Sequence, residues 1–318
     1  MAVSNSLKQS VQWASHVSGL TSVLAKNQGV SRIFMYHGVD DHGELVIEAF
    51  KRHLRYLSEN FRVISMTELV GRLESGSVEG DEVVLTFDDG LRNNVTNVYP
   101  ILHDMNIPAT YYVCPQLVTD GVWIWNLDVR ERLKFIENTS GPKLIDELIE
   151  RTGGKSCSKD RHESIVEWLK TLKPDQRNEL HDLIIRESRN YQPTEYSRTN
   201  NDLANWDELR KMDSNIITIG SHTSTHPILT TLTEEQLETE IGGSRKLLEE
   251  KLQRPVDFFS YPNGSNSDAV VDVVKRHYKS AVLAEYGYVK SDFDLFRLKR
   301  LPTVDNIYRF SWGMVKSR

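Results

Sequence analysis

The chain has 318 residues, of which 39% are hydrophobic and 26% are charged, as in a soluble globular protein with one large domain or two smaller ones. Its net charge of −6 gives no general reason to expect a nucleic-acid partner. Cys114 and Cys157 are the only cysteines, which excludes a disulfide framework and a cysteine-based zinc cluster and fits a reducing compartment. No apolar run is long enough to cross a bilayer.

Residues 1–30 are expected to form a helical segment ahead of the main domain, which spans 31–318. They contain no continuous apolar stretch like the core of a signal peptide. We therefore expect a cytoplasmic protein, and the inner face of the membrane is an alternative location. Apolar residues at helical spacing predict a helix whose apolar side packs on the body of the protein; shallow attachment to a membrane surface is the alternative. These residues are Leu7, Val11, Ala14, Val17, Leu20 and Leu24.

From residue 31 onward, short apolar stretches alternate with helical ones. The apolar stretches predict strands at 32–38, 60–64, 83–90, 108–113, 215–220 and 258–261. Strands that alternate with helices favour an α/β fold with a parallel sheet or barrel, in which reactive groups gather at the carboxyl ends of the strands. Asp88, Asp89, His222 and Tyr261 lie at such ends.

Between about residues 116 and 204, the strand signals largely vanish and helical spacing replaces them. This predicts a helical insertion in the barrel that covers one side of the site; a purely structural support is the alternative. After the insertion, Thr233 and Gln236 have the spacing of a capping box, so a firmly anchored helix is expected soon after His226.

Two adjacent carboxylates, Asp88 and Asp89, end the most apolar of the predicted strands. Burying carboxylates there is costly unless they bind a metal or transfer protons. Far along the chain, His222 and His226 are four residues apart in a connection that Pro227 is expected to keep tight rather than helical. Two histidines and one aspartate can hold a divalent ion and leave room for water.

These segments resemble the motifs of the polysaccharide deacetylases, which are the family-four carbohydrate esterases. Residues 86–90 (Thr-Phe-Asp-Asp-Gly) and 221–227 (Ser-His-Thr-Ser-Thr-His-Pro) resemble the first two motifs. Residues 259–264 (Phe-Ser-Tyr-Pro-Asn-Gly) are similar to the third motif in its Tyr-Pro-x-Gly variant. The resemblance covers about 31–115 and 203–305. It implies a distorted, incomplete (β/α) barrel and hydrolysis of an N-acetyl group on an amino sugar.

The resemblance also implies roles for single residues. Asp88 matches the catalytic base, and Asp89, His222 and His226 match the metal ligands. Zinc is the expected ion, with cobalt, manganese or nickel as alternatives. The backbone N–H of Asn263 matches the family's hydrogen-bond donor to the oxyanion.

Two parts of the family pattern are missing. The third motif lacks its usual arginine. A late strand is expected to supply this charge instead, through Arg300, which is favoured, or through Arg297. The late histidine motif with the general acid is also absent, and His277 lies in a helical pattern typical of a surface. His37, directly after the first strand, is therefore the predicted proton donor, with a supporting or substrate-binding role as the alternative.

Aromatic side chains are the remaining candidates. Tyr261 is predicted to shape the substrate pocket, with ordinary packing in the barrel as the alternative. Trp125 is the favoured surface for stacking on a sugar ring, ahead of Trp123 and Trp206, and packing is again the alternative.

Three functions stay open. The leading one is a metal-dependent deacetylase for an N-acetylated oligo- or polysaccharide, or for a nucleotide-linked or lipid-linked intermediate of surface polysaccharide made inside the cell. The others are a sugar-binding relative that has lost turnover and an amidohydrolase acting on a non-sugar C–N bond. A glycosidase is disfavoured because Asp88 and Asp89 are neighbours, whereas glycosidase carboxylates stand about 5 Å or more apart across a ring.

Overall fold

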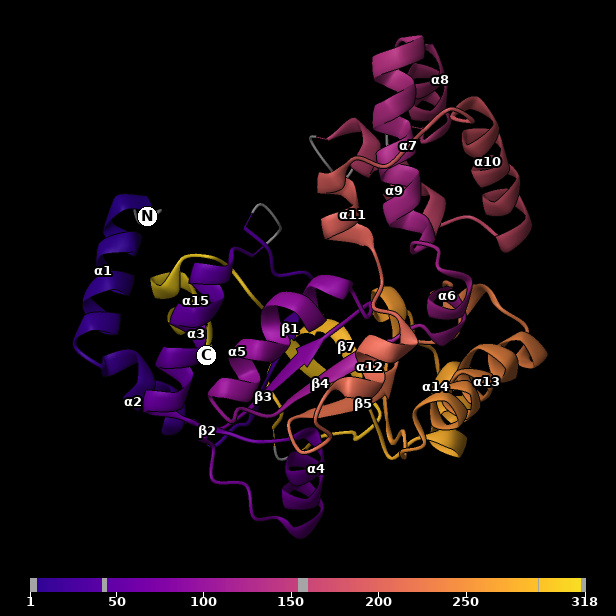
Figure 1. Ribbon diagram of the computed structural model, residues 1–318. Helices are drawn as coiled ribbons and strands as arrows, with labels where there is room; N and C mark the ends of the chain where they lie inside the picture. The colour runs from indigo at the N-terminus through magenta and orange to yellow at the C-terminus, as the bar shows by residue number, and fades with distance from the viewer. Residues whose placement is uncertain (1–4, 42–44, 154–159, 291, 316–318) are drawn as a thin grey trace.

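The computed structural model describes residues 5–41, 45–153, 160–290 and 292–315. At its centre is a ring of seven parallel strands, closed because β1 pairs with both β3 and β8 (Figure 1). The strands are β1 (Arg32–Tyr36), β3 (Glu82–Phe87), β4 (Ala109–Val113), β5 (Ile217–Ser221), β6 (Phe258–Ser260), β7 (Ser280–Tyr286) and β8 (Leu298–Pro302). A two-residue strand, β2 (Arg62–Val63), adds to the edge of β3.

The predicted α/β barrel is confirmed, and it is incomplete in having seven strands in its ring rather than eight. Each of the six predicted stretches contains a strand. β7 was not predicted, because only its first four residues are buried and the rest of the strand, up to Tyr286, is exposed.

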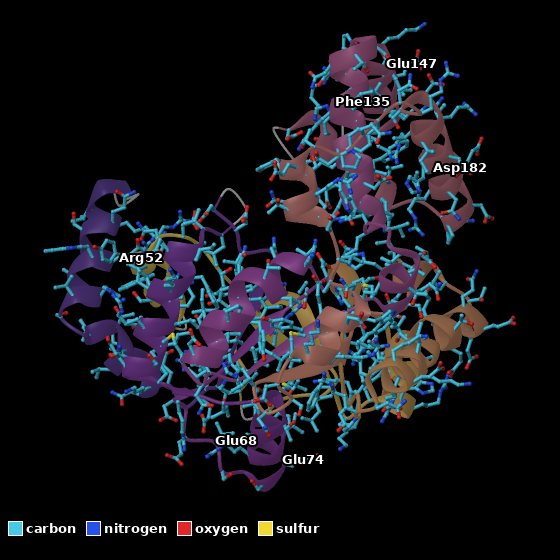
Figure 2. All side chains as sticks on the ribbon, viewed as in Figure 1. Arg52, Glu68, Glu74, Phe135, Glu147 and Asp182 are labelled. Carbon is cyan, nitrogen blue, oxygen red and sulfur yellow. The ribbon has the colours of Figure 1, made fainter. Side chains whose placement is uncertain are left out.

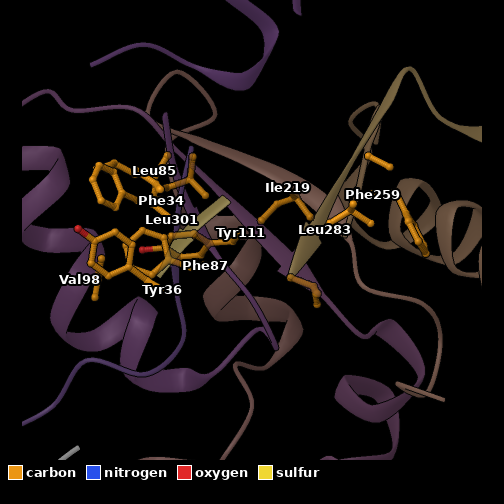
Figure 3. Packing of buried hydrophobic residues seen from close by; sticks show 14 of the residues in the cluster. Phe34, Tyr36, Leu85, Phe87, Val98, Tyr111, Ile219, Phe259, Leu283 and Leu301 are labelled. Atoms are coloured by element: carbon orange, nitrogen blue, oxygen red, sulfur yellow. The ribbon is translucent and has the colours of Figure 1, made fainter. Parts of the chain in front are cut away.

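Successive side chains of the barrel strands point to opposite faces and join different hydrophobic clusters. Most of these strands are therefore buried on both faces. Phe34, Tyr36 and Leu85 pack in the larger cluster, which includes residues of the surrounding helices (Figure 3). Ile33 and Val84 join a smaller cluster with residues of α4 (Met66–Ser75), a helix at the bottom of the barrel in Figure 1. This double burial explains why the strands are almost continuously apolar in sequence.

Helices follow most of the strands around the ring. They are α3 (Ile47–Asn60), the π-helical turn η1 (Asn94–Val98), α5 (Tyr99–Asp104), α12 (Trp206–Lys211), α13 (Glu234–Leu252), α14 (Asp268–His277) and α15 (Ile307–Gly313), with short 3-10 turns η2 (Leu229–Thr231) and η3 (Pro262–Gly264). The predicted capping box is present, since Thr233 and Gln236 exchange hydrogen bonds at the start of α13. This fixes where α13 begins after the histidine loop, which is the connection that carries His222 and His226.

The described residues between 116 and 204 are mostly helical and stand to one side above the barrel in Figure 1. Its helices are α6 (Pro115–Asp120), α7 (Trp125–Ser140), α8 (Lys143–Arg151), α9 (Arg161–Lys170), α10 (Pro174–Glu187) and α11 (Glu195–Asn201). Residues of α7 to α10, such as Leu133, Ile145 and Ile165, form a hydrophobic cluster separate from those of the barrel. The insertion is therefore a packing unit with a core of its own.

The N-terminal helices α1 (Asn5–Val17) and α2 (Leu20–Lys26) correct one prediction. All six apolar residues that define the predicted stripe are exposed, whereas the polar Gln12 and Ser15 are buried. The reason is that α1 is attached by polar contacts, including a hydrogen bond of 2.9 Å between His16 Nδ1 and Ser311 Oγ. Among the described residues, no helix has the length and apolar character needed to span a bilayer.

Candidate metal centre and active site

Side chains from two loops converge at the carboxyl ends of the strands. Asp89 lies just beyond β3, and His222 and His226 follow β5; their ligand atoms are within 4.8 Å of one another. Asp89 Oδ1 is 3.5 Å from His222 Nε2 and 3.6 Å from His226 Nε2. These gaps are too long for good hydrogen bonds, but two atoms bound to one zinc ion at about 2.0–2.1 Å in tetrahedral geometry are about 3.4 Å apart. The three side chains therefore fit a shared divalent ion.

Left-handed backbone gives the two loops this shape. Asp89 (φ 74°) and Gly90 (φ 69°) turn the chain directly after β3, which lets Asp88 and Asp89 face different partners. Thr223 (φ 68°) and His226 (φ 60°) bend the second loop, in agreement with the predicted tight connection. Such strained positions cluster at functional sites.

Hydrogen bonds fix the ring of His222 and the backbone of His226. The Nδ1–H of His222 donates to the carbonyl oxygen of Ser260 at 2.8 Å, which leaves Nε2 to face Asp89. The main-chain N–H of His226 donates to Thr223 Oγ1 at 2.9 Å. Burial lowers the pKa of His226 well below its ordinary value, so its ring is neutral, as a metal ligand must be.

Asp88 is buried beside these ligands and binds Arg300 through two hydrogen bonds. Nη1 donates to Oδ1 at 2.8 Å and Nη2 donates to Oδ2 at 2.6 Å. Burial alone would raise the pKa of Asp88, but the guanidinium of Arg300 holds this pKa well below its usual range. Of the two arginines considered, the structure places Arg300 at the aspartate, whereas Arg297 pairs with Asp268 near the surface.

The contacts that hold Arg300 were not predicted. Its Nη1 donates to Thr86 Oγ1 at 3.0 Å, and its Nη2 donates to Ser260 Oγ at 3.1 Å. Its Nε donates to the Leu283 carbonyl oxygen at 2.8 Å, so the guanidinium is fixed on all sides. Thr86 and Ser260 are polar residues inside apolar strands, and that interruption is the sequence signal that could have identified them.

Glu240 of α13 supports the histidine loop from behind. Its carboxylate accepts hydrogen bonds from the main-chain N–H of Thr225 at 2.9 Å and from the Thr225 hydroxyl at 2.7 Å. Thr225 directly precedes His226, so this contact fixes the loop on which this candidate metal ligand lies. No sequence signal distinguishes Glu240 from the other charged residues of its helix.

A cleft of about 550 Å³ opens over the proposed ligands. Asp88, His37 and Asn263 line it from the barrel, together with the three ligands. Residues of the insertion line a further side of the same cleft. The residues on this side are Asn126, Leu127, Arg130, Glu131, Lys134, Glu163, Lys170, Tyr196, Asn200 and Asn201.

Two predicted substrate contacts lie outside this cleft. Tyr261 is fully buried, and its hydroxyl donates to the Phe296 carbonyl oxygen at 3.0 Å, so it packs in the barrel rather than lining the pocket. Trp125 lines a neighbouring cavity with Trp123, and its indole N–H donates to the His226 carbonyl oxygen at 3.2 Å. Trp125 therefore contacts the loop that carries His226 from a neighbouring cavity and does not line the cleft itself.

Comparison with known proteins decides the family. The model of the family described as Polysaccharide deacetylase matches residues 75–151 and 185–282, more than half of the chain. The chain belongs to the polysaccharide deacetylase family. It is 21% identical, over 274 residues, to a protein named as a candidate polysaccharide deacetylase, YxkH of Bacillus subtilis (strain 168); the match covers 85% of this chain and 70% of YxkH.

Solved structures share this deacetylase fold. The Streptococcus pyogenes deacetylase PplD in complex with acetate superposes with a TM-score of 0.60 at 17% identity, covering 91% of this chain and 99% of PplD. IcaB from Ammonifex degensii has a TM-score of 0.58 at 14% identity, covering 90% of this chain and 97% of IcaB. Identities this low establish the fold alone, so the function of this deacetylase family member has to be argued from its own site.

Proposed function

We propose that the protein is a metal-dependent hydrolase that removes an N-acetyl group from an amino sugar in a glycan or glycan precursor. The observation that carries this proposal is the position of Asp88, a carboxylate paired with Arg300 directly beside a set of three metal-binding side chains. The donor set of one carboxylate and two imidazoles suits zinc, and cobalt, manganese and nickel accept such ligands too.

The chain's own residues divide the chemistry. A divalent ion bound by Asp89, His222 and His226 would polarise the acetyl carbonyl and acidify a water. Asp88, ionised and lining the cleft, is the group we assign to take the proton from the attacking water. The backbone N–H of Asn263, a residue of the same cleft, is the proposed hydrogen-bond donor to the oxyanion that forms as water adds.

His37 is the proposed donor of a proton to the leaving amine, because it lines the cleft with the base. In the variant His37→Ala, turnover is expected to fall about 10²–10⁴-fold and the basic limb of the pH–rate profile to disappear, since the general acid is gone. Acetate release measured across pH checks this. His277→Ala is the control, because His277 pairs with Glu238 on the outer surface at 2.7 Å. Near-normal turnover with an unchanged basic limb in His37→Ala would exclude this role.

For the substrate, we propose a short or carrier-linked N-acetylated glycan, such as a lipid-linked or nucleotide-linked intermediate of surface polysaccharide in the cytoplasm. The wall that the insertion builds on one side of the cleft supports this, since a long polymer crossing the site would meet it. The Streptococcus pyogenes deacetylase PplD was solved with acetate, the product that the proposed reaction would release.

Acetate release from a panel of N-acetylhexosamine substrates, free and carrier-linked, tests the proposed function. With added zinc, cobalt or manganese, the wild type should release acetate and an equal amount of free amine. Asp88→Asn, which keeps the side-chain shape but loses the basic carboxylate, should be about 10²–10⁴-fold slower. Equal rates for the two proteins, or acetate release without new amine, would refute the proposal.

The missing arginine of the third motif was one sequence argument for an inactive sugar-binding relative. Because Arg300 pairs with Asp88 from β8, that argument no longer applies. No observation on the described residues favours a non-sugar amide as the substrate.

A further inference from the structure

We propose that the outer face of α1 and α2 binds an anionic membrane surface, with the helices lying in the lipid–water interface. This inference concerns a surface outside the catalytic cleft and does not depend on the proposed function. Figure 1 shows α1 and α2 at the outer edge of the molecule, on the side of the barrel away from α13 and α14.

The exposed side of these helices carries many apolar side chains, with lysines among them. Along α1, Leu7 is 56% exposed, Val11 45%, Trp13 52% and Val17 63%. Leu20, Val23 and Leu24 continue the exposed apolar surface onto α2 and its start. Exposed apolar side chains grouped in this way mark an interaction surface, and tryptophan is enriched at membrane interfaces.

The inner side of the helices is polar and firmly attached, so the apolar side cannot turn inward. His16 bonds Ser311 in α15 at 2.9 Å and lies against Tyr56 of α3, with ring centroids 5.0 Å apart. The buried guanidinium of Arg32 donates to the carbonyl oxygen of Ala25 at 2.6 Å and to that of Met314 at 2.8 Å, which ties α2 to the barrel and to the end of α15. These contacts hold the apolar side outward.

The charge of this region suits an anionic partner. The chain has 45 acidic residues and a net charge of −6, yet residues 1–39 contain no aspartate or glutamate. Lys8 and Lys26 are exposed on α1 and α2. Neighbouring α3 adds exposed Arg52 and Arg55, and Figure 2 shows Arg52 on the same side of the molecule as α1. The acidic residues of α3 are Glu48, which pairs with Lys51 at 2.8 Å, and the exposed Glu59.

These charges favour a membrane over a second copy of the chain. In a symmetric dimer, the same patch lies on both sides of the interface, so the lysines of α1 and α2 would find no acidic residue of those helices to balance them. Anionic headgroups supply that balance, while the apolar side chains enter the boundary of the acyl chains. This is the arrangement of an interfacial amphipathic helix.

Flotation with vesicles tests the inference on the full chain. Wild-type protein should float with vesicles of phosphatidylglycerol and phosphatidylcholine in equal parts, bind phosphatidylcholine alone more weakly, and detach as salt is added. The combined variant Leu7→Ser, Val11→Ser, Val17→Ser should lower the partition coefficient at least about tenfold. The matched control replaces three comparably exposed apolar residues elsewhere, as Met105→Ser, Val122→Ser, Ile185→Ser, and should bind like the wild type.

The inference is overturned if wild-type protein does not bind the anionic vesicles, or if the control loses binding as much as the α1 variant. Light scattering without lipid tests the alternative that a second copy of the chain binds this surface. A wild-type dimer that the α1 variant converts to a monomer would assign the surface to a second copy instead. Unfolding curves of the three proteins should coincide, because the replaced side chains are exposed; a destabilised α1 variant with unchanged vesicle binding would also contradict the inference.

Discussion

Arg300→Met is expected to destabilise the folded protein by about 3–5 kcal/mol, because it leaves the buried carboxylate of Asp88 without its countercharge. Turnover of the folded fraction is also expected to fall, since burial alone raises the pKa of Asp88 and the carboxylate loses the hydrogen bonds that orient it. Denaturant unfolding and acetate release, measured on the same preparation, separate the two effects.

Arg297→Met is the matched control for this prediction. Its ion pairs with Asp268 and Asp294 are near the surface, so its loss should cost no more than about 1 kcal/mol and should leave turnover unchanged. If the two variants were equally stable, the ion pair between Arg300 and Asp88 would not have the structural importance inferred here.

The two variants should also differ in the pH dependence of unfolding. Because Arg300 lowers the pKa of Asp88 in the folded state, the ion pair stabilises the protein fully at neutral pH. This contribution is lost as the pH falls below the ordinary aspartate pKa of about 3.9. The stability difference between wild type and Arg300→Met should therefore shrink in acid, and a difference independent of pH would contradict the ion pair.

His222→Ala is expected to reduce turnover on the order of 10³-fold or more, because carbonyl polarisation and water activation are lost together with the bound ion. Acetate release at saturating zinc measures this. Chelation of the wild type should have a similar effect that added zinc reverses. His103→Ala is the control, since His103 is an exposed histidine on α5, outside the cleft. If His222→Ala turned over substrate as fast as the wild type, His222 could not be a ligand of the catalytic metal.

The barrel and the convergence of the candidate metal ligands could be predicted because their signals are local. An apolar strand that ends in Asp88 and Asp89 marks one half of the site, and two histidines before Pro227 mark the other. In a parallel barrel, strand ends meet at one rim, so the two halves had to face each other. The structure places them there, with one oxygen of Asp89 near both histidines.

The arginine that pairs with Asp88 could be narrowed only to two candidates. Asp88 and Arg300 are 212 residues apart in sequence. Arg300 lies within β8 and Arg297 just before it, and the sequence does not tell which of the two side chains reaches Asp88. The same limit applies to Tyr261, whose place in the third motif did not reveal the direction of its side chain, and to Trp125 at the start of α7 in the insertion. Side-chain direction follows from the register of the completed ring, which no single segment specifies.

The N-terminal helix shows a different limit of sequence patterns. Helical spacing of Leu7, Val11 and Val17 identifies an amphipathic helix but does not tell which side meets the protein. In the structure, hydrogen bonding of His16 to Ser311 decides the orientation, and the apolar side stays exposed. A pattern of apolar residues predicts that a helix face is buried, but it does not tell whether that face packs against the same protein or against a partner.

Metal content per chain tests the central claim most directly. After incubation with zinc and removal of unbound ions, elemental analysis should find one zinc per chain in the wild type and in Asp88→Asn. It should find none in a variant with alanine at 89, 222 and 226. A wild type that retains no zinc, cobalt, manganese or nickel, or a triple variant that binds as much as the wild type, would contradict the claim that Asp89, His222 and His226 form a shared metal site.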